Sequence, residues 1–202
     1  MIPIVVCTVG SPALPVMRAS IQAYAPEHPL LVRQGTEGNF GADYNIAMAE
    51  AFAEHDEIIV ANDDVVLTPD TMRVLMEDVA FLKQAGEKLG FVGTRADSIR
   101  PAQNIRHNDG AQILAVYVIS PVFAWLSKEA FQTAQFPPIN WYSDDVMCSD
   151  LHHQGFRNFI SRAYVHHAGS TTIGQDNQKN HEQAAPWVIQ NRPDYAKHWF
   201  NT

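Results

Sequence analysis

The sequence predicts an α/β fold built on a mainly parallel sheet. Short apolar runs rich in Ile and Val alternate with longer segments whose apolar residues recur at helical spacing, and turn residues separate the two. Strands that alternate with helices usually form parallel sheets, because each helix returns the chain to the same edge. Such sheets bind ligands beyond the carboxyl ends of their strands, so the polar residues that follow the strands are the first candidates for a site.

The first part of the chain contains three predicted strands and three predicted helices. Strands are expected at residues 2–9, 30–32 and 57–61, which are apolar runs bounded by turn residues. Helices are expected at residues 18–25, 42–54 and 69–83. Pro69 is assigned to the first position of the third helix, where proline is favoured.

After residue 93 the predicted strands are no longer separated by long helices. Strands are expected at residues 113–119, 122–126 and 158–167, with one helix at 144–154. Residues 171–184, rich in Gln, Asn and His, are expected to form a mobile loop. This second part therefore predicts strands of mixed direction beside the parallel ones.

Composition and charge exclude several classes of protein. Hydrophobic residues make up 46% of the 202 residues and charged residues 18%, which is typical of a globular protein and not of a disordered chain. The net charge of -8 opposes non-specific binding to nucleic acids and anionic membranes. The most basic stretch contains Arg95, Arg100, Arg106 and His107, and it is either solvated surface or a contact for phosphate or an anionic acceptor.

The cysteines and the N-terminus favour the cytoplasm. Cys7 and Cys148 lie far apart without the spacing of a metal site, so reduced thiols are expected. The chain begins without a basic signal-peptide region, and no apolar stretch approaches the roughly 18 residues of a membrane span. The sequence therefore predicts a cytoplasmic protein with no membrane span.

An acidic turn follows the third predicted strand. Asn62, Asp63 and Asp64 come directly after residues 57–61, so they are expected at the ligand-binding edge of the sheet. Oxygen ligands suit Mg²⁺ or Mn²⁺, which keep one or two protein carboxylates and take their other ligands from phosphates and water. The same residues also occur where aspartate only begins a turn.

Three segments, in this order, resemble the family-2-like glycosyltransferases of the GT-A fold: residues 7–12 (CTVGSP), 39–45 (NFGADYN) and 58–65 (IIVANDDV). The resemblance implies a Rossmann-like domain with a central, mainly parallel mixed sheet flanked by helices. It also implies a nucleoside diphosphate sugar as donor, with UDP-sugars the commonest. The positions that it assigns to the nucleotide are Thr8, Val9, Gly10, Ser11, Asn39, Gly41 and Asn45.

The resemblance also implies a metal site. The Asp-x-Asp motif of the family corresponds to residues 62–64, which makes Asp64 the expected ligand of Mn²⁺ or Mg²⁺. Asn62 then contacts ribose or water, and Asp63 is the middle residue of the motif. A His-x-x-Gly-Ser/Thr element completes the metal shell in the family, and His166 fits it best. His167 points to the opposite face if the strand continues, so only one of the two histidines is expected at the metal.

A second acidic pair resembles the catalytic block of the family. Residues 141–146 (WYSDDV), followed by a helix and Gly155, match its aromatic, Glu-Asp, helix and glycine pattern. In inverting members the Asp of that pair is the general base, which takes the proton of the acceptor hydroxyl. Alignment from the aromatic side makes Asp145 the base, whereas alignment from Gly155 shifts the register by one, so Asp144 also stays a candidate. A helix N-terminus alone would favour the same residues.

The C-terminal segment resembles the end of family members through Tyr195, Lys197 and Trp199. Residues 174–182 are expected either to fold over the donor as a lid, with Lys179 or His181 near the diphosphate, or to form a solvated loop. We expect one domain over residues 1–202, divided into a nucleotide-binding half at 1–93, an acceptor and catalytic half at 94–170, and a lid and tail at 171–202.

The sequence thus predicts a metal-dependent, inverting glycosyltransferase that acts on an acceptor hydroxyl. The acceptor class stays open among glycans, small molecules, proteins and modified nucleic acids, and no feature indicates an oligomeric state. One alternative is a nucleotide-sugar-binding or scaffold protein without activity, because Asn62 replaces the first Asp of the metal motif. A nucleotidyltransferase is a weaker alternative, because the chain lacks a Gly-rich phosphate loop followed by Lys.

Overall fold

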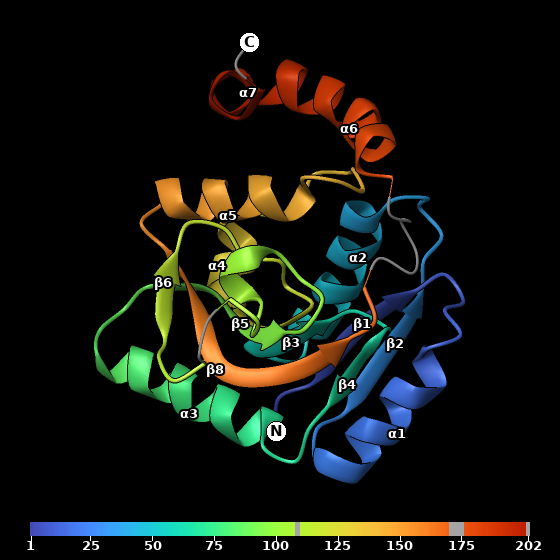
Figure 1. Cartoon of the computed structure of the whole chain (residues 1–202), viewed down its shortest axis with the longest axis vertical. Helices are drawn as coiled ribbons and strands as arrows, with labels where there is room; N and C mark the ends of the chain where they lie inside the picture. The colour runs from blue at the N-terminus through green and yellow to red at the C-terminus, as the bar shows by residue number, and fades with distance from the viewer. Residues whose placement is uncertain (108–109, 170–175, 201–202) are drawn as a thin grey trace.

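A mixed sheet forms the centre of the computed structural model, which describes residues 1–107, 110–169 and 176–200 (Figure 1). The strands run in the order β2-β1-β3-β7-β5-β8-β4, and β6 pairs with β8 off this path. Their bounds are β1 Ile4–Thr8, β2 Leu30–Gln34, β3 Glu57–Ala61, β4 Val65–Leu67, β5 Leu89–Ala96, β6 Leu114–Val116, β7 Phe123–Ser127 and β8 Arg157–His167.

The sheet is mainly parallel, as predicted. The pairs β1–β2, β1–β3 and β5–β8 are parallel, whereas β7 runs antiparallel to both β3 and β5. Because β4 and β6 are also antiparallel to β8, five of the described strands run in one direction and three in the other. The carboxyl ends of β1, β2 and β3 therefore lie at one edge, which is where the sequence places its acidic turn.

Helices cover both faces of the sheet (Figure 1). On one face lie α1 and α3, and on the other lie α2, α4 and α5. The helix bounds are α1 Leu14–Tyr24, α2 Phe40–Phe52, α3 Thr71–Gln84, α4 Lys128–Thr133, α5 Ser143–His153, α6 Asn177–Asn191 and α7 Pro193–Phe200, with a 3₁₀ turn at Pro101–Gln103. In the described residues no helix is long and apolar enough to cross a membrane.

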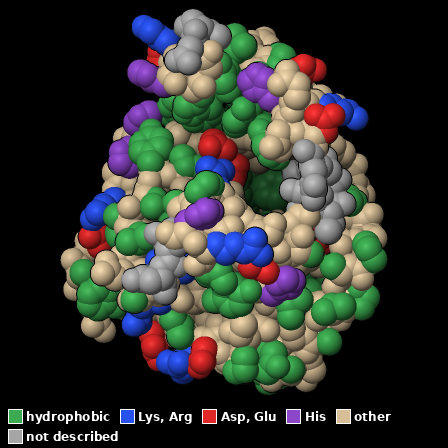
Figure 2. Space-filling view, viewed as in Figure 1, with side chains coloured by type: hydrophobic (Ala, Val, Ile, Leu, Met, Phe, Trp, Pro, Cys, Tyr) green, Lys and Arg blue, Asp and Glu red, His purple; other side chains and the backbone are tan. Residues whose placement is uncertain are grey.

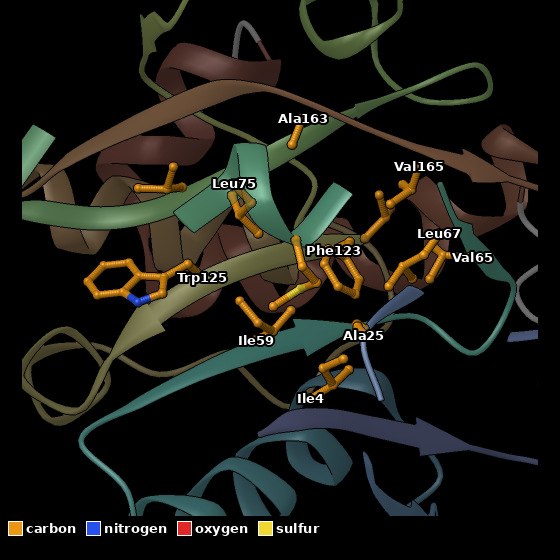
Figure 3. Packing of buried hydrophobic residues seen from close by; sticks show 14 of the residues in the cluster. Ile4, Ala25, Ile59, Val65, Leu67, Leu75, Phe123, Trp125, Ala163 and Val165 are labelled. Atoms are coloured by element: carbon orange, nitrogen blue, oxygen red, sulfur yellow. The ribbon is translucent and has the colours of Figure 1, made fainter. Parts of the chain in front are cut away.

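Alternation along the strands divides the core into two clusters. In β1, Ile4 and Val6 pack toward α1 and α3, whereas Val5 and Cys7 pack toward α2 and α5. Figure 3 shows the first cluster, in which side chains of the central strands, among them Phe123 and Trp125, share one buried face with Leu75 of α3. Each fully buried side chain of this size contributes about 1.5–3 kcal/mol relative to an exposed one. Burial on both faces explains why these strands are continuous apolar runs.

A third cluster attaches the C-terminal helices. Helices α6 and α7 lie beyond α5, away from the sheet (Figure 1). Val188 of α6 and Ala196 of α7 pack against Val146 of α5 and Ile139, with partly buried aromatic residues around them. The C-terminal helices therefore form an outer layer on α5.

Three local predictions were wrong. Residues 177–184 form the first half of α6, not a loop, because they continue into a helix with one buried face, which contains Asn180, Ala184, Ala185 and Val188. Residues 171–175 lie outside the described residues. Helix α3 begins at Thr71, two residues after Pro69. Helix α1 begins at Leu14, four residues before the predicted start, with a proline in its first turn.

Candidate active site

A cavity of about 880 Å³ opens at the carboxyl ends of β1 and β3. Its wall also includes the first residues of α2 and α5, the loops after β2 and β5, and Asn177 of α6. The molecular surface is visibly hollowed on this side, and acidic and basic side chains gather next to the hollow (Figure 2). The volume lies in the range of about 300–1,000 Å³ that is typical of small-molecule sites. Eight residues predicted from the sequence line it: Thr8, Val9, Asn39, Asn62, Asp63, Asp64, Asp144 and Asp145.

The described part of the cavity wall is strongly acidic. It contains five carboxylates, those of Asp43, Asp63, Asp64, Asp144 and Asp145, and a single guanidinium, that of Arg100. His167 is the one imidazole in the same part of the wall. A diphosphate entering this cavity would be repelled unless a cation accompanied it, since unscreened like charges in a partly buried site cost more than in water.

Asp63 ties the acidic turn to the first loop. Its carboxylate accepts hydrogen bonds from the hydroxyls of Thr8 and Ser11. Burial raises the pKa of Asp63, as does the charge of Asp64, while the two hydroxyls act in the opposite direction. The Thr8 hydroxyl oxygen also accepts a hydrogen bond from the amide of Gly10, 3.0 Å away. Gly10 and Ser11 thus brace the loop from outside the cavity wall, and the positive φ of 96° at Gly10 favours glycine there.

Asp64 and His167 face each other at the floor of the site. Nε2 of His167 lies 3.2 Å from Oδ1 of Asp64, and both side chains are less than a tenth exposed. Nδ1 of His167 hydrogen-bonds the carbonyl of Ser98. Burial alone would lower the pKa of His167, but the hydrogen bond and charge of Asp64 raise it, together with the Ser98 carbonyl and Asp97. The two side chains thus place a carboxylate oxygen beside an imidazole nitrogen at the acidic turn.

His166, the predicted metal-binding histidine, does not lie in this position. Its side chain is 55% exposed and pairs with Asp97. Successive residues of a strand point to opposite faces, and His167 shares its face with the buried Val165. The alternation of side-chain direction along residues 165–167 therefore identifies the histidine beside Asp64 better than the spacing between His166 and Gly169 does. The structure brings His167 to Asp64 and leaves His166 outside the cavity wall.

The second acidic pair is organised by Arg100. Nη2 of Arg100 lies 2.9 Å from Oδ2 of Asp144 and 3.2 Å from Oδ2 of Asp145. The Ser120 hydroxyl donates to the same Oδ2 of Asp144 at 3.0 Å and accepts from Nε of Arg100 at 2.8 Å. Burial raises the pKa of Asp144 to about 6, with the charge of Asp145 acting in the same direction and that of Arg100 against it. Both candidate bases thus face the cavity in one hydrogen-bonded cluster.

In the structure, the predicted nucleotide motif at residues 39–45 mainly caps α2 and attaches it to residues 136 and 137. Asn39 caps the helix by accepting from the amide of Ala42, although it also lines the cavity. The Asn45 side chain bonds both backbone groups of Phe136, donating to the carbonyl at 2.8 Å and accepting from the amide at 3.1 Å. At Gly41, a Cβ atom would lie 1.7 Å from the carbonyl oxygen of Pro137. These contacts give Gly41 and Asn45 a packing role in the structure.

We expect Gly41→Ala to destabilise the fold without touching the cavity. The added methyl group must displace the backbone at Pro137, and overpacking of this kind costs about 1–3 kcal/mol. At about 2–4 °C per kcal/mol for a chain of this size, the thermal midpoint should fall by roughly 2–12 °C. The exposed Ala49→Ser on the same helix is the control and should change the midpoint little. Equal midpoints for Gly41→Ala and wild type would refute the packing role.

Lys179, predicted near the diphosphate, lies in the first turn of α6. Its backbone amide donates to the carboxylate of Asp176, which caps the helix, and its side chain is exposed. It is not part of the cavity wall, to which α6 contributes Asn177. Residues 174 and 175 of the predicted lid lie outside the described residues.

Sequence reasoning gave no role to Asp43 and only a general one to Arg100. Asp43 is buried in the first turn of α2, where Oδ1 accepts from the amides of Thr36 at 2.7 Å and Glu37 at 3.0 Å. An acid in a first helical turn is common, so no sequence signal separated it from an ordinary helix start. Arg100 meets the acidic pair across 44 residues of chain, and only tertiary structure shows that contact.

Comparison with known proteins identifies the fold. No family model and no curated protein matches the sequence. Among solved structures, TarS 1–349 of S. aureus in complex with UDP matches with a TM-score of 0.62 at 13% identity, covering 93% of this chain and 65% of that one. The TarS complex with UDP-GlcNAc gives a TM-score of 0.57 at 14% identity, covering 93% and 56%. A197 from STIV also matches at 0.57 and 13%, covering 79% and 81%.

These similarities extend over most of the chain. The chain spans about two thirds of the TarS 1–349 protein that it matches, and most of A197. The chain adopts the GT-A fold of glycosyltransferase domains.

Proposed function

We propose that the protein is a metal-dependent glycosyltransferase that moves a sugar from a UDP-sugar to an acceptor hydroxyl. The observation that carries the proposal is the joining of two acidic groups in one cavity, Asp64 with His167 on one side and Asp144 with Asp145 on the other. The first suits a diphosphate-bound cation, and the second suits proton removal. The GT-A fold and the UDP and UDP-GlcNAc complexes of the similar TarS support the choice of donor.

The residues at Asp64 fit a divalent cation. Two ligands at about 2.1 Å from an octahedral metal and at right angles lie about 3.0 Å apart, close to the 3.2 Å between Asp64 Oδ1 and His167 Nε2. The bond from Nδ1 to the Ser98 carbonyl leaves Nε2 as the ligand atom, which is the usual support for a metal-binding histidine. The described residues contain no group of three or more such ligands, so diphosphate and water would supply the rest.

Asp64 and His167 would hold the cation, which would neutralise charge on the diphosphate as it leaves. Asp145, with Asp144 as the alternative, accepts the proton of the acceptor hydroxyl. The oxygen then forms its bond to the anomeric carbon, and the bond from that carbon to the diphosphate oxygen breaks. UDP leaves with that electron pair. Attack opposite the leaving group inverts the anomeric carbon.

Asp43, which also lines the cavity, favours uracil as the base of the donor. Its Oδ1 is occupied by two backbone amides, and Oδ2 has no hydrogen-bond partner among the described residues. A carboxylate oxygen accepts a hydrogen bond from the N3–H group of uracil, whereas N3 of cytosine carries no hydrogen. We therefore expect UDP to bind more tightly than CDP.

Thermal stability against nucleoside diphosphates tests the proposal. With Mn²⁺ or Mg²⁺ and UDP at about 100 times the dissociation constant, binding should stabilise the fold by about 2.7 kcal/mol and raise the midpoint by roughly 5–10 °C. Chelator should remove most of this shift, and CDP should give a smaller one. Lack of a shift with every nucleotide would contradict the donor assignment. A shift with UDP-sugars that are never turned over would indicate a nucleotide-sugar-binding protein instead.

The transfer rate should fall as the pH drops below about 6. A raised pKa means that Asp144 is protonated below this value and charged above it. Protonation breaks its ion pair with Arg100, which leaves the guanidinium to hold Asp145 more strongly and weakens that base. Arg100→Gln removes the guanidinium that couples the two carboxylates, so protonation of Asp144 should no longer weaken Asp145 by this route and the acidic limb near pH 6 should be lost. Identical pH–rate profiles for wild type and Arg100→Gln would exclude this coupling.

A further inference from the structure

Tyr142 has an unusual backbone at the entrance to the acidic pair. Among the described non-glycine residues it alone has a positive φ, 66°. A bulky side chain is disfavoured in this left-handed region, and such a conformation persists only where surrounding structure enforces it. Tyr142 directly precedes α5, and Asp144 and Asp145 follow in the first turn. The backbone of Tyr142 therefore sets the direction in which α5 leaves the cavity wall.

The C-terminal helices hold the Tyr142 side chain. Its hydroxyl lies 2.9 Å from Nδ1 of His181, on α6. The ring packs against Trp199, with centroids 6.0 Å apart, and against Phe200 at 5.3 Å, both on α7. Burial raises the pKa of the Tyr142 phenol, so the hydroxyl keeps its proton for this hydrogen bond. The groups that contact the Tyr142 side chain thus include one residue of α6 and two of α7.

The same outer layer is fixed to the far end of α5. Asp150 accepts from Nη2 of Arg192 at 2.8 Å and from the hydroxyl of Tyr195 at 2.7 Å. His153 also hydrogen-bonds Tyr195. Helices α6 and α7 thus contact both ends of α5. Because they are anchored at its C-terminal end, their contacts with Tyr142 can restrain the first turn of α5.

We infer that His181 is a positioning residue that holds Tyr142 in its left-handed conformation and thereby places the carboxylates of Asp144 and Asp145 in the cavity. The expected effect of His181 on catalysis rests on the proposed function, whereas its effect on the conformation of Tyr142 and the first turn of α5 does not. Neither histidine nor tyrosine need touch the reacting atoms. A displacement of the base of about 1 Å can cost about 100-fold in rate, so a restraint of this kind would have a large effect.

Four variants test the inference. His181→Leu removes the hydrogen bond at similar size, and His181→Asn keeps a polar atom near the position of Nδ1. Tyr142→Phe removes only the hydroxyl and keeps the ring contacts. The exposed His198→Leu on α7 is the matched control. Hydrogen exchange of the amides of residues 143–147 is measured without substrate, and UDP affinity and kcat with a UDP-sugar are measured separately.

Loss of the hydrogen bond should speed exchange in residues 143–147 by roughly tenfold, with no change in α2. The kcat should fall by about 10- to 100-fold at unchanged UDP affinity, and His181→Asn should restore most of it. His181→Leu and Tyr142→Phe should not be additive, because they remove the same bond. Unchanged exchange in both variants, or an equal effect from His198→Leu, would overturn the inference whatever the activity. Absence of any turnover by wild type would overturn the proposed function and leave the exchange result to decide the coupling.

Discussion

Asp145→Asn is expected to lower the rate of sugar transfer by about 10²- to 10⁴-fold while UDP affinity in Mn²⁺ stays nearly constant. The amide has the shape of the carboxylate but cannot take the proton of the acceptor hydroxyl. The donor end of the cavity, at Asp43 and Asp64, is left intact. Single-turnover transfer and calorimetric titration with UDP separate the two effects.

Asp144→Asn is the necessary companion, because the sequence left both residues as candidates. Oδ2 of Asp144 is already engaged by Arg100 at 2.9 Å and by Ser120 at 3.0 Å. Asp145 has longer contacts with Arg100, at 3.2 and 3.3 Å, and is freer to accept a proton. We therefore expect the smaller loss for Asp144→Asn. The reverse order would reassign the base to Asp144, and wild-type rates in both variants would exclude the pair altogether.

His167→Ala and Asp64→Asn are expected to abolish the metal-dependent part of UDP binding. Residues that only hydrogen-bond a metal ligand typically change metal affinity by roughly 10- to 100-fold when they are mutated, and loss of a direct ligand should weaken binding by more than this. His166→Ala is a closely matched control, since it removes an imidazole one residue away that is 55% exposed and paired with Asp97. The measurement is the UDP dissociation constant in Mn²⁺ and in chelator for each protein.

The adjacent histidines make this comparison decisive. If His166→Ala weakened metal-dependent binding and His167→Ala did not, the assignment drawn from the 3.2 Å contact with Asp64 would be wrong. Equal UDP affinity in Mn²⁺ and chelator for wild type would contradict the metal site as a whole.

Local sequence patterns predicted the sheet and the edge that carries the site. The buried run at residues 57–61 followed at once by Asn62, Asp63 and Asp64 indicated a strand with acids at its carboxyl end, and the structure has this arrangement. Alternating strands and helices likewise indicated the α/β class. Both patterns involve residues that are close together in the sequence, which is why the sequence alone could predict them.

Contacts between distant segments could not be read in the same way. The cluster of Arg100 with Asp144 and the packing of α6 on α5 join residues far apart in sequence. The first half of α6 was predicted as part of a loop because residues 177–183 are polar, and the apolar residues that α6 packs against α5 follow them in the sequence. Gly41 and Asn45 were assigned to the nucleotide by resemblance, yet their visible partners are the backbone groups of Pro137 and Phe136.

The most direct measurement is a crystal structure of the protein with UDP and Mn²⁺, with an anomalous map recorded at the manganese edge. We expect one strong peak within about 2.5 Å of the Asp64 carboxylate and of Nε2 of His167, with the diphosphate bound to the metal and uracil near Asp43. A manganese peak elsewhere with no nucleotide in the cavity, or UDP bound there without manganese, would refute the proposed metal and donor sites.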